Sequence, residues 1–183
     1  MKKILFILIL IVACAPGVYS QNIAVKTNGL GWAAAATMNA GLEVGVAPKW
    51  TIVLDGLYNP WTWSNDKKSK AWGLQLEGRY WFCYKYTGHF IGLHTQYTSY
   101  DAGMKKYNYD GWLTGAGISY GYALPVAKWC RVEFNLGAGY LHKSYDKTDR
   151  IQNRDYNVVY RGHFKKNQFG LTKAGINVVF LLR

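Results

Sequence analysis

The end of this chain constrains its fold more than any other stretch. Residues 168–182 read QFGLTKAGINVVFLL, and only Arg183 follows. Apolar side chains recur at every second position of this stretch, at Ala174, Ile176, Val178, Phe180 and Leu182. Because side chains alternate across a strand, one face requires an apolar medium and the other does not. A strand at the end of a chain leaves an open sheet edge, which barrels remove by pairing the last strand with the first.

Seven further segments of alternating polarity precede this one, with turn residues between them. They span residues 23–30, 41–47, 50–59, 71–82, 89–100, 112–122 and 129–145. Eight is the minimum strand number of single-chain outer-membrane barrels, and most segments approach the roughly 9–11 residues that a tilted strand needs to cross a membrane. The sequence therefore predicts an all-β fold, an eight-stranded antiparallel up-and-down transmembrane β-barrel.

The connections between these segments alternate in length. Short ones cover residues 47–49, 83–88 and 123–128, and longer ones cover residues 30–40, 60–70, 101–110 and 146–167. Outer-membrane barrels have short periplasmic turns and longer extracellular loops. We therefore expect the outer membrane of a Gram-negative bacterium, with both termini on the periplasmic side.

The first twenty residues have the pattern of a secretory signal peptide. Lys2 and Lys3 precede an apolar stretch, and Val-Tyr-Ser before Gln21 suits cleavage. We expect residues 1–20 to be removed and residues 21–183 to form one barrel domain.

The three cysteines leave two questions. Residues 11–14 match a lipobox, so lipidation of Cys14 is the alternative to cleavage; we favour cleavage because a barrel is already anchored. Export permits a disulfide between Cys83 and Cys130. Alternation points Cys83 inward and Cys130 outward on non-neighbouring strands, so we expect two unpaired thiols.

Charged residues indicate which face of the sheet points inward. The polar faces carry four residues of each sign, Lys26, Arg79, Arg131 and Lys173 against Glu43, Asp55, Glu77 and Glu133. A soluble barrel of the lipocalin type would turn these faces to water, where no balance is required. In a narrow interior balance is required, because an unpaired buried charge is very costly. We therefore expect a charge network inside the barrel and lipid around it.

Aromatic residues favour the same orientation. They lie near the short turns at Trp50, Phe82 and Trp129, and towards the longer connections at Trp72, Tyr97, Trp112 and Tyr140. Two rings of aromatics mark the two interfaces of a membrane barrel. The alternative is a soluble β-protein with ordinary core and surface aromatics.

The chain is basic, with a formal net charge of +12. Much of the excess lies in the last connection, at Lys147, Arg150, Arg154, Arg161, Lys165 and Lys166. Export separates the chain from nucleic acid, so we expect outer-membrane lipid, lipopolysaccharide or a surface protein as the partner. The alternative is that these charges are simply solvated.

Four motifs carry a family resemblance: NPW at residues 59–61, RYWFC at 79–83, GHFIG at 88–92 and GAGISYGY at 115–122. In these the chain resembles an uncharacterised family of small Bacteroidota outer-membrane proteins, known as a domain of unknown function. The resemblance implies an eight-strand barrel of the OmpA and OmpX type. Some relatives are similar to components encoded near fimbrial clusters. The family supplies no catalytic residues.

A second resemblance concerns the terminal strand. Lys173, Gly175, Val178 and Phe180 resemble the C-terminal signal that outer-membrane proteins present to their insertion machinery. That machinery is therefore an expected partner.

Patterns for catalysis are weak. The four histidines lack metal-ligand spacing, and we expect no metal and no cofactor. His142 and Ser144 resemble the base and nucleophile of outer-membrane phospholipases, with Asn153 or Asn157 to orient the base. The Asn-Gly that follows in those enzymes is absent here.

The sequence thus predicts a non-enzymatic structural or surface-interaction protein that works through its extracellular loops. The family resemblance implies a link to fimbrial or cell-envelope assembly. A lipid-modifying enzyme using His142 and Ser144, and a narrow channel, are the alternatives. Side chains fill so small a barrel, which disfavours the channel.

Overall fold

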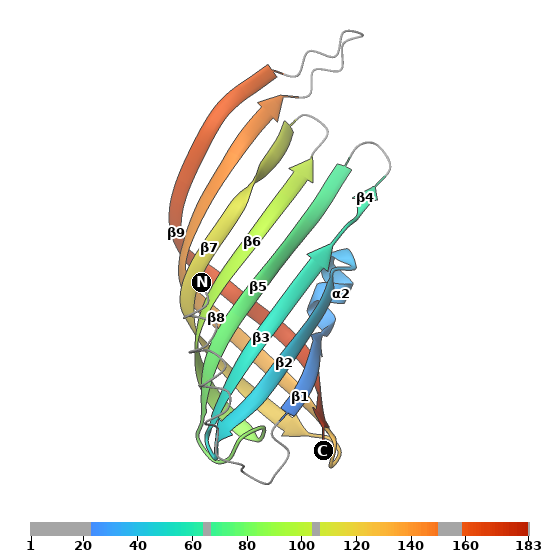
Figure 1. Ribbon diagram of the computed structural model, residues 1–183, viewed down its shortest axis with the longest axis vertical. Coiled ribbons are helices and arrows are strands. Elements are labelled where there is room, and N and C mark those ends of the chain that lie inside the picture. Colours follow the sequence, from blue (N-terminus) through green and yellow to red (C-terminus); the bar gives the residue numbers. More distant parts are fainter. Residues whose placement is uncertain (1–22, 64–66, 104–106, 150–158, 183) are drawn as a thin grey trace, which may run out of the picture.

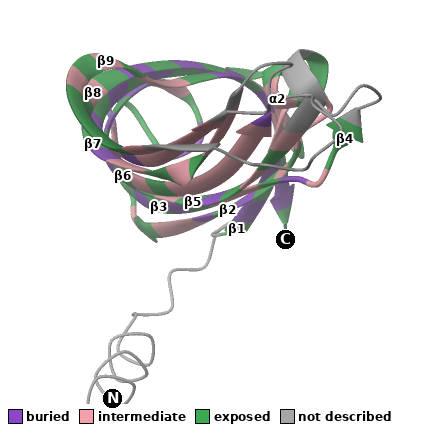
Figure 2. Cartoon of the chain, turned by 90° about the horizontal axis from the view of Figure 1, so that it is seen from above, coloured by how far each residue is buried: buried purple, intermediate pink, exposed green. Residues whose placement is uncertain are grey.

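The computed structural model describes residues 23–63, 67–103, 107–149 and 159–182. Eight antiparallel strands run up and down in chain order and form one ring-like sheet (Figures 1 and 2). They are β1 (Ile23–Asn28), β2 (Met38–Ala47), β3 (Trp50–Asn59), β5 (Lys67–Trp81), β6 (Gly88–Gly103), β7 (Tyr107–Pro125), β8 (Cys130–Asp149) and β9 (Val159–Leu182). The two-residue strand β4 (Thr62–Trp63) pairs with the beginning of β5.

The ring closes through two pairings. Strand β9 pairs with β1 from Ile23 opposite Leu182 to Asn28 opposite Asn177. Strand β3 pairs with β5 along its whole length, although β4 lies between them in the sequence. The predictions of eight antiparallel up-and-down strands and of a first strand paired with the last are therefore confirmed.

The longer connections are shorter than predicted, because the strands on either side continue into them. Strands β6 and β7 extend to Gly103 and from Tyr107, so little of the predicted loop at 101–110 remains. Strands β8 and β9 extend to Asp149 and from Val159. These extensions have polar residues on both faces, and hydrophobic periodicity therefore does not reveal them.

A short helix, α2 (Gly29–Ala35), was also missed. The side chain of Asn28 caps it by accepting a hydrogen bond from the Leu30 N–H at 3.0 Å. It ends at Ala36, whose φ of 47° is left-handed and whose N–H bonds back to the last turn. The helix begins where β1 stops, two residues before the predicted end of that strand.

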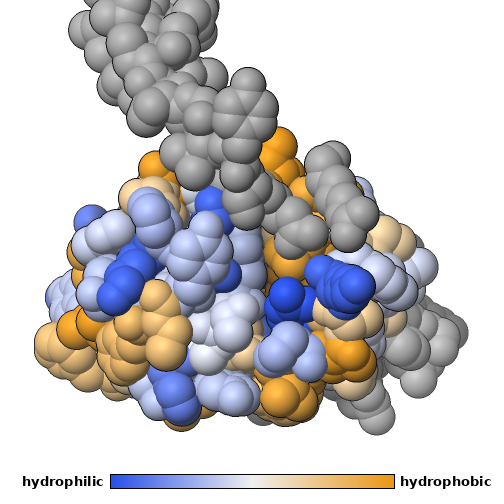
Figure 3. Space-filling model, turned by 90° about the horizontal axis from the view of Figure 1, so that it is seen from below, coloured by the Kyte–Doolittle hydropathy of each residue, from blue (hydrophilic) through white to orange (hydrophobic). Residues whose placement is uncertain are grey.

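Polar faces point into the ring and apolar faces point out, as the charges predicted. Leu93 on β6 is 69% exposed and its neighbour Ile118 on β7 is 67% exposed. Figure 3 shows apolar patches around the outline of the lower end, with hydrophilic side chains between them. Within the described residues, no helix is long and apolar enough to cross a membrane.

Aromatic packing fills the interior near the short turns. Trp81 and Phe90 are fully buried, with ring centroids 4.7 Å apart. The Arg79 guanidinium lies 4.3 Å from the centroid of the Phe90 ring. A Cβ at Gly121 would collide with that ring, so glycine is required there for Phe90 to enter. Side chains therefore fill the interior of the ring at this level.

The turn between β5 and β6 closes this end. Tyr86 has a left-handed φ of 64° and packs with Ala24, Val179 and Leu181. Its burial raises the pKa of the phenol, and the Glu43 carboxylate adds to that effect. Cys83, predicted to point inward, is exposed in this turn because β5 ends at Trp81; it and Cys130 are free thiols, as expected.

Candidate functional site

A network of buried ion pairs crosses the middle of the ring, centred on Arg79. Its Nη1 lies 2.8 Å from Glu133 and 3.0 Å from Glu43. Its Nη2 and Nε bond to Glu133 and Glu77 at 3.1 and 2.8 Å. One guanidinium therefore joins carboxylates from three strands, β2, β5 and β8, and its planar fork suits such multiple contacts.

Two lysines extend this network upward. Lys173 Nζ lies 2.9 Å from Glu77 and 3.1 Å from Asp55. Lys26 Nζ lies 3.3 Å from the same Asp55 oxygen. The structure thus brings together seven of the eight predicted residues, which we name the charge cluster: Lys26, Glu43, Asp55, Glu77, Arg79, Glu133 and Lys173.

Arg131, the eighth, does not join the cluster. Its Nη1 donates instead to the carbonyl oxygens of Ala127 and Cys130 in the turn before β8. It lies one residue from the end of the strand, where turn carbonyls are closer than the cluster carboxylates. Its prediction as part of the network was wrong.

Uncharged residues complete the cluster and were missed from the sequence. Ser119 donates to Glu77, and Thr51 donates to Glu43 at 2.6 Å. Asn135 and Asn177 each donate to Glu133 at 2.8 Å. All four lie on the inward face by simple alternation, which is the signal that could have found them.

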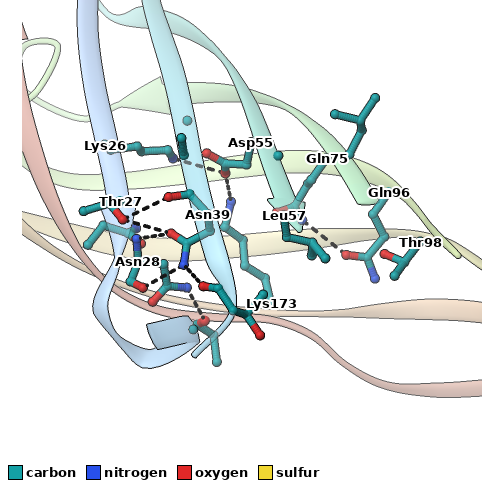
Figure 4. Close-up of a pocket in the computed structure, with 18 of the residues that line it drawn as sticks. Lys26, Thr27, Asn28, Asn39, Asp55, Leu57, Gln75, Gln96, Thr98 and Lys173 are labelled. Carbon is teal, nitrogen blue, oxygen red and sulfur yellow. Dashed lines mark hydrogen bonds and ion pairs between the residues drawn. The ribbon is translucent and has the colours of Figure 1, made fainter. Parts of the chain in front are cut away.

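A cavity of about 220 Å³ lies beside the upper part of the cluster (Figure 4). Its polar lining comes from β1, β2, β3, β5, β6 and β9 and includes Lys26, Asn28, Asn39, Asp55, Gln75, Gln96, Thr98 and Lys173. Lys26 is 3% exposed, and its Nζ donates no hydrogen bond to any described residue despite its ion pair. A buried ammonium group without a described hydrogen-bond acceptor therefore lies beside a space large enough for several waters.

A chain of three side chains lies on the outer wall, near the upper ends of β8 and β9. Ser144 Oγ lies 2.9 Å from His163 Nε2, and His163 Nδ1 lies 2.8 Å from Asp146 Oδ1. This is the order of contacts in a serine–histidine–aspartate triad. Ser144, however, is only 2% exposed.

The predicted pairing of His142 with Ser144 differs from this arrangement. His142 Nδ1 lies 2.5 Å from Asn167 Oδ1, and its ring lies against Trp112 with centroids 5.4 Å apart. His163 is the partner of Ser144 because it faces Asp146 across the β8–β9 ladder. Asn153 and Asn157 lie outside the described residues.

The remaining histidines have separate places. His94 is buried, and its Nε2 lies 2.9 Å from Thr172 Oγ1. His89 lies 2.6 Å from the Tyr120 hydroxyl, on the outside. Among the described residues, no three metal-ligating side chains come together.

The predicted cationic loop is largely strand. Lys147 lies on β8, and Lys165 and Lys166 lie exposed on β9, which also contains Arg161. Arg150 and Arg154 lie outside the described residues, as does the predicted signal peptide. The four described cations follow the ends of two strands instead of a loop, because β8 and β9 extend further than predicted.

Residues of the predicted insertion signal divide between the two faces of β9. Lys173 and Gly175 face the interior, and Phe180 faces outward against Trp129 with ring centroids 5.8 Å apart. They therefore contribute to the charge cluster and to the outer apolar wall respectively.

Comparison with known protein families gives a match over nearly the whole chain. A family model described as "Protein of unknown function (DUF3575)" matches residues 5–182. The chain belongs to the DUF3575 family. No curated protein and no solved structure matches it.

Proposed function

We propose that this DUF3575 protein is a transmembrane β-barrel of the bacterial outer membrane that serves as a structural or surface-interaction protein. The single observation that carries the proposal is the outward apolar wall around a charged interior. Soluble monomers rarely expose contiguous apolar patches larger than a few hundred Å². Here apolar side chains such as Leu93, Ile118 and Leu136 are exposed on successive strands.

Aromatic contacts support a membrane of defined thickness around this wall. Trp129 and Phe180 stack near the lower turns, beside the chain terminus. Near the other end, the ring of Tyr97 lies 5.7 Å from Trp72 and 6.3 Å from Trp112. Such aromatic girdles occupy the two membrane interfaces. Both termini would then lie in the periplasm.

The packed interior argues against a channel. Arg79 and its three carboxylate partners cross the ring, and Trp81 and Phe90 fill the space below them. A conducting path would have to break these buried ion pairs, at several kcal/mol each. Flat current traces in planar bilayers are the expected result.

The extracellular end is the part of the barrel that we propose interacts with partners. It carries the exposed Lys165 and Lys166 and the aromatic pair of Tyr145 and Phe164. Lipopolysaccharide phosphates and surface proteins, including fimbrial or envelope components, fit a cationic aromatic surface. Lipid is the partner implied by the apolar wall, and the barrel insertion machinery is the partner implied by the terminal strand.

Detergent dependence tests the membrane part of this proposal. The mature chain should remain folded in detergent or lipid and should migrate faster on a gel before heating than after it. Removal of detergent should precipitate it. A folded, dispersed monomer in plain buffer would refute the proposal.

A lipid-modifying enzyme is the second candidate, favoured by the contacts of His163 with Ser144 and Asp146. Ser144 would be the nucleophile and His163 the base, in place of the predicted His142. The burial of Ser144 ranks this candidate second, because a substrate carbonyl must reach the nucleophile. Esterase assays with fluorophosphonate labelling, against Ser144→Ala, decide it: equal, background signals in both proteins exclude the enzyme.

A further inference from the structure

Strand β9 has a long edge without a partner strand. It pairs with β8 from Val159 onward, but with β1 only over Asn177–Leu182. Within the described residues, no strand pairs with the other side of residues 159–176. On that side of β9, the Ala174 carbonyl accepts a hydrogen bond from Asn28 Nδ2 at 3.2 Å. Figure 1 shows the upper part of β9 rising along β8.

The backbone groups at this edge can be assigned from the register. The Leu181 N–H donates to the Trp129 carbonyl, on the β8 side. Alternate residues point their N–H groups to opposite sides of a strand. One register shift, beside Gly137 and Ala138, moves the pattern by one residue. The N–H and C=O groups of His163, Lys165, Asn167 and Phe169 therefore point away from β8.

Side chains along this edge have a definite chemistry. We name residues 162–169 the open edge. Its outward face carries His163, Lys165 and Phe169, the last of which is 82% exposed. Phe164 and Lys166 alternate with them on the other face. Neither lysine forms an ion pair with a described carboxylate, so the edge presents two free cations among aromatic rings.

We propose that the open edge binds an extended acidic segment of another polypeptide as an added strand. An exposed edge is a template for strand addition, in which main-chain hydrogen bonds supply affinity and alternate side chains supply selectivity. Glutamate or aspartate opposite Lys165 on the outward face, with apolar residues opposite Phe164 on the other face, would match the open edge. This inference rests on the proposed function, because that function puts the open edge outside the membrane.

A second copy of the chain is the less favourable occupant. Two open edges paired antiparallel about Lys165 would bring this residue opposite Lys165 of the other copy. Like charges directly opposite destabilise a strand pair. Lysines at an edge also protect a sheet against pairing with itself. The charge of the edge therefore selects a partner of opposite sign.

Peptide binding to the full mature chain in lipid nanodiscs tests the proposal. The probe is a fluorescein-labelled eight-residue peptide that alternates glutamate with valine, followed by fluorescence anisotropy. Two further peptides carry N-methyl groups on every valine or on every glutamate. Only one series removes the N–H groups that face β9, so one series should weaken binding at least tenfold more than the other. Equal binding of the two N-methylated peptides would mean that charge attraction alone holds the peptide, and would overturn strand addition.

A matched pair of variants tests the same contact from the protein side. Asn167→Pro removes an N–H from the open edge, whereas Asn167→Ala keeps that N–H and loses the same contact with His142. The proline variant should bind at least tenfold more weakly than the alanine variant. Equal affinities would overturn the proposal, as would dimerisation that Asn167→Pro abolishes, since that would assign the edge to a second copy.

Insertion separates this inference from the proposed function. Every variant is first checked for incorporation into nanodiscs and for heat-dependent gel mobility. A protein that inserts normally and binds no acidic peptide would refute strand addition while the membrane account stands. Failure of the unmodified mature chain to insert would refute the membrane account itself.

Discussion

Arg79 on β5 donates two hydrogen bonds, of 2.8 and 3.1 Å, to Glu133 on β8, which is 54 positions away in the sequence. Two strands lie between these strands in the sheet, so the pair spans the interior of the ring. A bidentate contact of this kind fixes the distance between two walls. We regard it as the central structural contact of the charge cluster.

Replacing Arg79 should destabilise the protein strongly. Arg79→Met leaves Glu43, Glu77 and Glu133 buried without the guanidinium they share. Removing one partner of a buried pair costs roughly 3–5 kcal/mol. Urea unfolding in detergent, followed by tryptophan fluorescence, measures the change. Lys165→Met, at an exposed position, is the control and should unfold within about 0.5 kcal/mol of the parent.

Glycine at 139 should be required for the ring to close tightly. A Cβ there would collide with the backbone of Ala116 and Gly117 on β7, which cannot move aside as a side chain can. Gly139→Ala should therefore lose about 1–3 kcal/mol, the usual cost of overpacking. Gly78→Ala meets nothing within 4 Å and should be neutral. Comparable unfolding midpoints for the two variants would contradict this packing.

Phe180 should matter more for assembly than for stability once folded. It is the aromatic residue of the predicted insertion signal and stacks on Trp129 at the chain's end. Phe180→Ala should slow insertion into outer-membrane vesicles that contain the insertion machinery, by several-fold. Phe134→Ala, an exposed aromatic on β8, should insert at the parental rate. Identical kinetics for both would remove Phe180 from the proposed insertion signal.

Cys83 reports which side of the membrane the short turns face. It is exposed in the β5–β6 turn, beside the buried Tyr86. A membrane-impermeant maleimide should label it only after the outer membrane is permeabilised. Cys130→Ser removes the second thiol from the assay. Labelling of intact cells would reverse the proposed orientation, and with it the placement of the open edge.

Alternation predicted the strands wherever one face was apolar. The bounds of β3 were found without error, because Trp50, Ile52 and Leu54 contrast with Thr51 and Asp55. The same contrast identified seven residues of the charge cluster. It does not exist above Phe169, where Lys165, Lys166 and Asn167 follow one another, so the upper half of β9 was predicted as a loop.

The sequence did not predict which side chains contact one another. Ser144 was paired with His142, its neighbour on the same face, whereas the ladder brings His163 to it from the segment predicted as a loop. Arg131 was assigned to the interior by alternation alone, but turn carbonyls hold it. Helix α2 was missed because seven residues with two glycines carry too little helical periodicity.

Determining whether lipid or water surrounds Leu93 tests the central claim most directly. Leu93 lies on the outward wall in β6. A spin label on Leu93→Cys, in a chain that also carries Cys83→Ser and Cys130→Ser, can be compared in nanodiscs with one at exposed Lys165. The account predicts that the label at 93 collides often with oxygen, which dissolves in lipid, and rarely with a water-soluble nickel complex, while the label at 165 does the opposite. Frequent collisions of the label at 93 with the nickel complex would mean that water touches the apolar wall, and would contradict the account.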